Sequence, residues 1–322
     1  MRGWRGGRAV GAVVAAVAVL GAFGCEAAPP GGRASAPAAP LSGDSAPGPG
    51  TATDAAGPAD AAGRPVALVY RGPAACEGCA EAAAEMLGRG GFAVRFVGPG
   101  ERVRFGRAAL AGVALYVQPG GTNGQEVGAA WRLLRREEGF SPDLVRDFVR
   151  GGGRYLGLCM GGYLAGDPGY DLLPGDSGQY IRSQGASVSG EGDQLVEVAW
   201  RGRPQRMYFQ DGPYFDVDGP GTQVLARYTN QRPAAVVAAY GAGRVAVSGP
   251  HPEAPAQWYE DYHLPDQSPS SAALGEDLLH TLMAPAAAPA PPAPGPAPAS
   301  GPAPASPPVP APVSPPAPPS AH

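Results

Sequence analysis

The sequence contains no lysine, and its 24 basic residues are all arginines. Only 16% of the 322 residues are charged, and the formal net charge is -4. No stretch gathers enough arginines to form the basic surface that nucleic-acid-binding proteins use. The composition therefore argues against nucleic acid as a partner.

Cysteine and histidine are also scarce, with four residues of each. Cys76 and Cys79 are the one closely spaced pair of cysteines. A closed zinc site needs four ligands, so two cysteines without histidine or acidic partners are too few. We therefore predict no bound metal, and nothing in the sequence requires a cofactor.

Glycine and proline, in contrast, are abundant, with 50 and 40 residues. This load is too high for one compact domain and indicates disordered segments. Residues 25–64 hold few large apolar side chains and are predicted to be a disordered linker. Residues 284–322 are mostly proline and alanine and predict an extended, disordered tail. This tail is either a cell-envelope spacer or a ligand for a partner with a proline-binding groove.

Residues 1–24 have the pattern of a bacterial signal peptide. Three arginines precede the apolar run AVGAVVAAVAVLGAFG, which is short for a membrane-spanning helix. Cys25 follows directly and resembles the acylated cysteine of a lipoprotein signal. This predicts an extracytoplasmic protein that a lipid at Cys25 anchors to the cell membrane. Plain secretion after cleavage, or an uncleaved anchor, are the alternatives.

Residues 65–283 are predicted to form one α/β domain with a sizeable core. The apolar run at 65–72 has the character of a strand buried on both faces, and further strands are predicted at 92–98, 112–121 and 154–159. Helical patterns lie between them, and Ser141 with Pro142 predicts one helix start. The alternation predicts a mostly parallel, flavodoxin-like sheet with helices on both faces. After about residue 176, short strands are expected to extend the sheet with some antiparallel pairing, before a closing helix at 270–283.

One cysteine, Cys159, lies among glycines in the stretch GGGRYLGLCMGGYLAG, residues 151–166. Gly157 to Gly161 has the form G-x-nucleophile-x-G of a nucleophile elbow, a strained turn that presents a nucleophile above a sheet. The N-terminus of the following helix favours a thiolate and offers backbone N–H donors. The alternative is a structural cysteine in a glycine-rich turn.

The stretch VSGPHPE supplies the partners that a cysteine nucleophile needs. His251 can take the thiol proton, and Glu253 is close enough to orient the imidazole. Both are expected on a loop at the same sheet edge as Cys159, where substitution should not disturb the fold. An exposed His-x-Glu pair without a role is the alternative.

The surrounding pocket has weaker signals. Gly120 and Gly121 follow the third strand, and their amides, with that of Met160, predict an oxyanion hole. A plain turn is the alternative. Trp258 is assigned to packing. The stretch MYFQDGPYF mixes polar and aromatic side chains that either line the pocket or belong to the core: Tyr208, Gln210, Asp211 and Tyr214.

Cys76 and Cys79 follow the first strand and open a helix. In an exported protein this pair is expected to be oxidised, which leaves Cys159 free. A structural disulfide, a redox or regulatory pair, and a metal site all remain open as interpretations.

Together these stretches resemble the class I glutamine amidotransferase fold, and within it the biotin-protein ligase N-terminal domain family. The matching stretches are YRGP, LYVQPGG, GGGRYLGLCMGGYLAG, MYFQDGPYF and HPE, and the resemblance covers most of residues 65–283. It implies a catalytic triad of Cys159, His251 and Glu253. No further stretch of this sequence predicts a biotin ligase catalytic domain, so biotinylation is not implied.

The predicted activity is amide hydrolysis by an exported protein. The ammonia released from glutamine would meet no ATP-dependent synthetase outside the membrane. This counts against glutamine and favours a small amide or an envelope peptide as substrate. Two other functions stay open: a ligand-binding module without turnover, and a thiol redox protein that uses Cys76 and Cys79.

Overall fold

The computed structural model describes residues 59–122 and 124–285. The predicted signal peptide, Cys25, most of the predicted linker and nearly all of the proline-rich tail lie outside these residues. Within the predicted linker, Ala59 forms a β-bridge with Pro65. None of the helices between residues 59 and 285 is long and apolar enough to cross a membrane.

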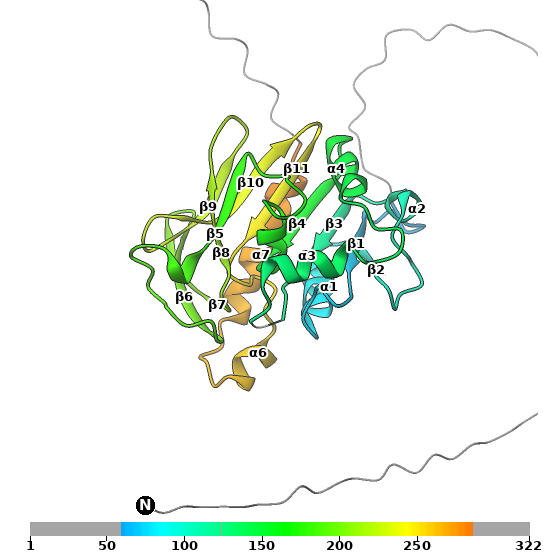
Figure 1. Ribbon diagram of the computed structural model, residues 1–322. Coiled ribbons are helices and arrows are strands. Elements are labelled where there is room, and N and C mark those ends of the chain that lie inside the picture. The colour runs from blue at the N-terminus through cyan, green and yellow to red at the C-terminus, as the bar shows by residue number, and fades with distance from the viewer. Residues whose placement is uncertain (1–58, 123, 286–322) are drawn as a thin grey trace, which may run out of the picture. The chain divides into compact units, whose positions relative to one another are not determined.

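The centre of the fold is a nine-stranded sheet in the order β2-β1-β3-β4-β11-β10-β9-β6-β7 (Figure 1). Its first five strands are parallel, and β1 and β3 are buried throughout, as expected for strands covered on both faces. Counted along the chain, their order is 2-1-3-4-5, the flavodoxin-like arrangement. The predicted fold class is confirmed. The parallel strands are β1 (Val66–Tyr70), β2 (Ala93–Val97), β3 (Leu115–Gln118), β4 (Arg154–Leu158) and β11 (Gly243–Ser248).

The remaining four strands of the sheet pair in antiparallel fashion, as expected for the later part of the chain. They are β6 (Gln194–Trp200), β7 (Arg203–Phe209), β9 (Gln223–Tyr228) and β10 (Pro233–Tyr240). A separate two-stranded sheet pairs β5 (Gly175–Gln179) with β8 (Pro213–Val217). The stretch MYFQDGPYF is thus divided between two sheets, because the chain turns at Asp211, which has a φ of 48°.

Helices cover both faces of the sheet, as predicted. In β1, Ala67 and Val69 belong to the same core as α1 and α7, whereas Val66 and Leu68 belong to the core on the other face. That second face is covered by α3, α4 and α5 (Figure 1). The bounds are α1 (Cys79–Arg89), α3 (Val127–Leu134), α4 (Pro142–Arg150), α5 (Met160–Leu164) and α7 (Ser268–Met283). Two further short helices, α2 (Arg107–Leu110) and α6 (Ala256–Asp261), and a 3₁₀ turn (Tyr180–Arg182) lie in connections.

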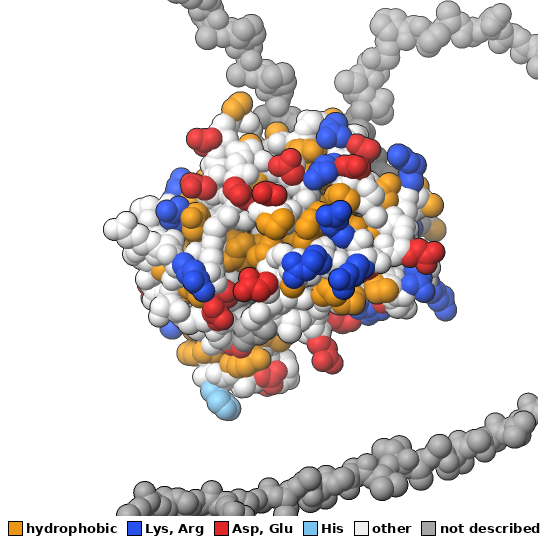
Figure 2. Space-filling view, viewed as in Figure 1, with side chains coloured by type: hydrophobic (Ala, Val, Ile, Leu, Met, Phe, Trp, Pro, Cys, Tyr) orange, Lys and Arg blue, Asp and Glu red, His pale blue; other side chains and the backbone are white. Residues whose placement is uncertain are grey.

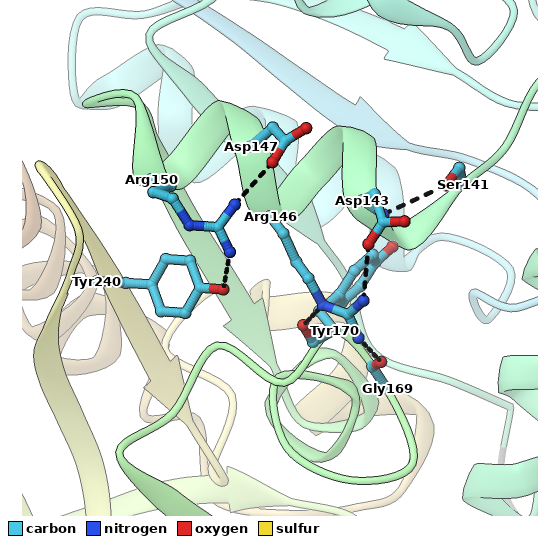
Figure 3. Close-up of polar contacts among 8 residues, drawn as sticks. All are labelled: Ser141, Asp143, Arg146, Asp147, Arg150, Gly169, Tyr170 and Tyr240. Atoms are coloured by element: carbon cyan, nitrogen blue, oxygen red, sulfur yellow. Dashed lines mark hydrogen bonds and ion pairs between the residues drawn. The ribbon is translucent and has the colours of Figure 1, made fainter.

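Helix α4 begins where the sequence predicts. The Ser141 hydroxyl accepts a hydrogen bond from the backbone N–H two residues later, at 3.3 Å. Further along the helix, Arg146 donates to the Tyr170 carbonyl at 2.6 Å, and Arg150 donates to the Tyr240 hydroxyl at 3.1 Å (Figure 3). These contacts tie α4 to the loop after α5 and to β10, and so support the segment that carries Cys159.

Charges of both signs are interspersed on the surface. Figure 2 shows arginine and acidic side chains side by side on this face of the described residues. Several form exposed ion pairs along helices, such as Arg150 with Asp147 at 2.7 Å. Pairs of this kind contribute little to stability.

Candidate active site

Three neighbouring parallel strands carry the predicted catalytic segments to one edge of the sheet. Strand β3 ends at Gln118, which pairs with Gly157 of β4. Strand β11 ends at Ser248, which pairs with Leu158. The segments that follow these strands therefore start side by side. Cys159, which follows β4, lies between the glycine turn after β3 and the histidine loop after β11.

Cys159 forms the sharp turn between β4 and α5. Its φ of 48° and ψ of -105° are strained for a residue with a side chain. It is buried and has no disulfide partner among the described residues. A methyl group on Gly157 would overlap the Gly161 carbonyl, and one on Gly161 would overlap the Gln118 carbonyl. The glycines of the motif are therefore required by the close backbone packing of this turn.

His251 and Glu253 form a buried hydrogen-bonded pair. The distance from His251 Nδ1 to Glu253 Oε1 is 2.8 Å, and each residue is 2% exposed. His251 Nε2 is buried and has no hydrogen-bond partner in the described part of the chain. Burial lowers the pKa of His251, but the Glu253 carboxylate and the neighbouring Cys159 outweigh it and raise this pKa to about 10. The loop placement agrees with expectation, whereas the full burial of both side chains does not.

One small volume beside Gly120 is bordered by the thiol residue, the imidazole and the disulfide. A methyl group on Gly120 would lie 3.0 Å from His251 Cε1, 3.2 Å from Cys79 Sγ and 3.8 Å from Cys159 Cβ. The three side chains are therefore neighbours. Glycine at this position leaves the space between them open.

The predicted oxyanion residues lie beside Cys159. A methyl group on Gly121 would lie 2.9 Å from Met160 Cβ, so these two residues adjoin. The Met160 amide is the first of α5, and the first amides of a helix have no intrahelical acceptor. The Gly120 carbonyl is occupied, because it accepts a hydrogen bond from the Cys76 amide at 2.9 Å.

Cys76 and Cys79 are joined by a disulfide, and Cys79 is the first residue of α1. The sequence gives no sign that this disulfide lies against His251 and Cys159. The fold explains it, because β1 neighbours β3 and the loop after β1 opens at the same sheet edge. The disulfide is thus part of the wall of the site.

Two adjoining cavities open at this edge. The first, of about 450 Å³, is lined by Cys159 and Met160, among others. The second, of about 320 Å³, is lined by His251 and the disulfide. Thr122 and Gln210 line both cavities. Cys159 and His251 therefore line neighbouring halves of one site.

Three of the four expected pocket residues line these cavities: Tyr208 the second, Asp211 the first and Gln210 both. Tyr214 lines neither, because β8 turns away from the main sheet. Its ring packs under the Arg232 guanidinium, 4.1 Å from the centroid.

The segment after the His-Pro-Glu motif contributes to the site, which no motif in the sequence predicts. Trp258, assigned to packing, lines the second cavity. The one available signal was the dense mixture of aromatic and acidic residues in QWYEDYH, directly after the motif.

The first cavity contains buried acceptors without donors. Asp211 Oδ2 accepts a hydrogen bond from Gln179 at 2.7 Å, but Asp211 Oδ1 and Gln125 Oε1 have no partner among the described residues. Burial raises the pKa of Asp211. Unpaired buried acceptors are costly, so this cavity suits a ligand that brings N–H or O–H donors. No group of three or more His, Cys, Asp or Glu side chains in the described ranges could hold a metal ion.

The parallel strand order, with the sharp cysteine turn after β4, defines a flavodoxin-like α/β fold. No family model and no curated protein matches the sequence.

Solved structures do resemble the chain. A glutamine amidotransferase is 21% identical, with 65% of this chain and 98% of that chain covered and a TM-score of 0.42. PurLQS from Thermotoga maritima is 19% identical, with 68% and 99% covered and a TM-score of 0.46. A second glutamine amidotransferase, also from Thermotoga maritima, is 16% identical, with 68% and 96% covered and a TM-score of 0.47. At these identities the likeness is one of fold.

Proposed function

We propose that this chain is a cysteine-dependent amide hydrolase with the triad Cys159, His251 and Glu253, acting on a small amide or peptide. The observation that carries the proposal is the buried 2.8 Å contact between His251 and Glu253 beside a strained, unbridged cysteine. A packing cysteine needs neither a strained backbone nor a charged histidine beside it. The motifs further support a stand-alone relative of the biotin-protein ligase N-terminal domain family.

In the proposed mechanism, the Cys159 thiolate attacks the amide carbon and forms a C–S bond. The amides of Gly121 and Met160 hold the resulting oxyanion. The protonated His251 gives its Nε2 proton to the leaving nitrogen as the C–N bond breaks. Water then attacks the thioester and returns a proton to His251, which releases the carboxylic acid and restores the thiolate. Glu253 holds the imidazole in its orientation through the hydrogen bond to Nδ1.

The test is acylation by an activated ester, p-nitrophenyl acetate. The wild type should release a burst of about one p-nitrophenolate per chain and carry the acetyl group on Cys159. The Cys159→Ala variant should lose the burst, and His251→Ala should lose most of it. His280→Ala, which changes an exposed histidine on α7, should keep it. Equal bursts from the wild type and Cys159→Ala would rule out the nucleophile.

A second candidate function, thiol–disulfide exchange, is favoured by one observation: the disulfide and Cys159 border the same small volume. Attack of the Cys159 thiolate on the Cys79 sulfur would form a new S–S bond and release the Cys76 thiolate. Differential alkylation with peptide mapping separates the two functions. A bonded Cys76–Cys79 pair with free Cys159 supports the hydrolase, whereas Cys159 bonded to either cysteine supports exchange.

We also propose that the chain is exported and lipid-anchored at Cys25, on the evidence of the arginines, the apolar run and the cysteine that follows. A disulfide between Cys76 and Cys79 agrees with an oxidising compartment. The mature chain should sediment with membranes, and Cys25→Ala should abolish the lipid modification. An intact mass showing an unmodified chain that begins beyond residue 25 would contradict the anchor.

A further inference from the structure

The second cavity lies on the side of the site from which the amine must leave. His251 lines this cavity, and Cys159 lines the first. In amide hydrolysis the acyl group stays on the nucleophile, and the departing nitrogen takes its proton from the base. The acyl part of a substrate therefore occupies the first cavity and the leaving amine the second. The amide bond then lies near Thr122 and Gln210, which line both.

Three aromatic rings border the second cavity. The Tyr208 ring centroid lies 5.2 Å from that of Trp258 and 6.4 Å from that of Tyr262. Both neighbouring rings are inclined to Tyr208, by 52° and 58°, rather than stacked on it. Tyr262 is 51% exposed, more than any other large hydrophobic side chain among the described residues. A cavity lined by several aromatic rings is suited to a cation, because an aromatic ring attracts a cation to its face.

The second cavity is also acidic. Glu77, Asp193 and Asp261 line it, and no arginine between residues 59 and 285 does. Asp193 accepts hydrogen bonds from the Tyr208 hydroxyl and, at 2.8 Å, from the Gln210 amide. The negative charge of Asp193 also raises the pKa of Tyr262, so the electrostatic potential of this carboxylate extends to the exposed tyrosine ring. His251, the one basic side chain that lines this cavity among the described residues, is paired with Glu253 at 2.8 Å. The remaining carboxylates and aromatic rings are complementary to an organic cation.

We infer that the second cavity binds an ammonium group carried by the leaving amine of the substrate. This inference rests on the proposed function for the role of the leaving amine. The substrate is then a secondary amide, R–CO–NH–R′, in which R′ carries the cation. The C–N bond breaks, His251 supplies the proton to the nitrogen, and water supplies the hydroxyl of the acid. A primary amide releases ammonia, which makes no use of a cavity of about 320 Å³.

Choline and its neutral isostere 3,3-dimethylbutan-1-ol test the cavity directly, because they differ in charge and hardly in shape. Binding is measured by ligand-observed NMR titration of the Cys159→Ala chain at constant ionic strength. Choline should bind at least about tenfold more tightly than the isostere. A second substitution in the Cys159→Ala chain, either Asp261→Asn or Tyr262→Ala, should weaken choline binding several-fold. Both side chains are exposed, so neither change should unfold the domain.

The matched control is Glu260→Gln, which alters an exposed acid next to Asp261 that does not line the cavity. It should leave choline binding unchanged. Equal binding of the two probes, or choline binding that neither cavity variant weakens, would overturn the inference.

A second arm tests the position of the cation in the substrate. The N-acetyl amide of 2-aminoethyltrimethylammonium should be cleaved with a higher kcat/KM than that of 3,3-dimethylbutylamine, and Asp261→Asn should remove the difference. If choline selectivity holds while ester acylation fails, the cavity assignment stands and the hydrolase does not. If acylation holds without choline selectivity, the hydrolase stands and the cation subsite does not.

Discussion

The Gly161→Ala variant should fail to fold stably, which is the largest effect of a single methyl group that we expect in this chain. The added methyl would overlap the Gln118 carbonyl, which belongs to the backbone of β3 and cannot turn aside as a side chain can. Overpacking a core typically costs about 1 to 3 kcal/mol, but relief here requires moving a central strand, so the cost should exceed that range. Total stabilities are about 5 to 15 kcal/mol, so a cost above that range removes a large fraction of the stability.

Thermal unfolding by circular dichroism measures this effect, with Gly88→Ala as the matched control. Gly88 lies on α1 with no neighbouring atom within 4 Å, so an alanine there should stabilise the helix by about 0.5 to 1 kcal/mol. A Gly161→Ala protein that melts at the wild-type temperature would show that the turn around Cys159 is not packed as described.

The Glu253→Ala variant should lose about 3 to 5 kcal/mol of unfolding free energy at neutral pH, because it leaves the buried His251 without its partner. The sequence places both residues on a loop and predicts a tolerant site, but their burial reverses that expectation. Glu253→Gln retains a hydrogen-bond acceptor and should lose less. The measurement is urea denaturation of the three proteins.

The pH dependence of this loss follows from the raised pKa of His251. The stabilisation that comes from protonating His251 in the folded state is complete below the unfolded pKa of about 6.5. It disappears as the pH rises towards the folded value of about 10, so the difference between the wild type and Glu253→Ala should narrow in alkali. Glu260→Ala, on the exposed side of α6, should change stability by no more than about 0.5 kcal/mol. A Glu253→Ala protein as stable as this control would contradict a buried ion pair.

The parallel half of the fold could be predicted because its signals are local. Buried strands such as β1 and β3 are continuous apolar runs bounded by turn residues. The start of α4 is set by the Ser141 cap and the proline that follows. Gly157 is limited by the Gly161 carbonyl, four residues along the chain, so this part of the motif is visible in the sequence, whereas Gly161 is limited by Gln118 of β3.

Features that depend on which strands become neighbours could not be predicted. Strand β5 has the sequence GDSGQ, without a single apolar residue, and it forms by backbone pairing with β8. The position of the disulfide beside His251 arises from the position of β1 beside β3. Trp258 lines the second cavity and Tyr214 lines neither cavity, and both positions likewise follow from chain turns that no local pattern encodes.

The central claim, that Cys159 is a nucleophile paired with His251, is tested most directly by the rate of its alkylation with iodoacetamide as a function of pH. A free thiol has a pKa near 8.5 and is only a few per cent thiolate at neutral pH. We predict that Cys159 reacts faster than a model thiol between pH 6 and 7, that His251→Ala loses most of this excess, and that Glu253→Gln loses less. If the wild type titrates like a model thiol and both variants match it, Cys159 is a packing residue and the chain is a binding module.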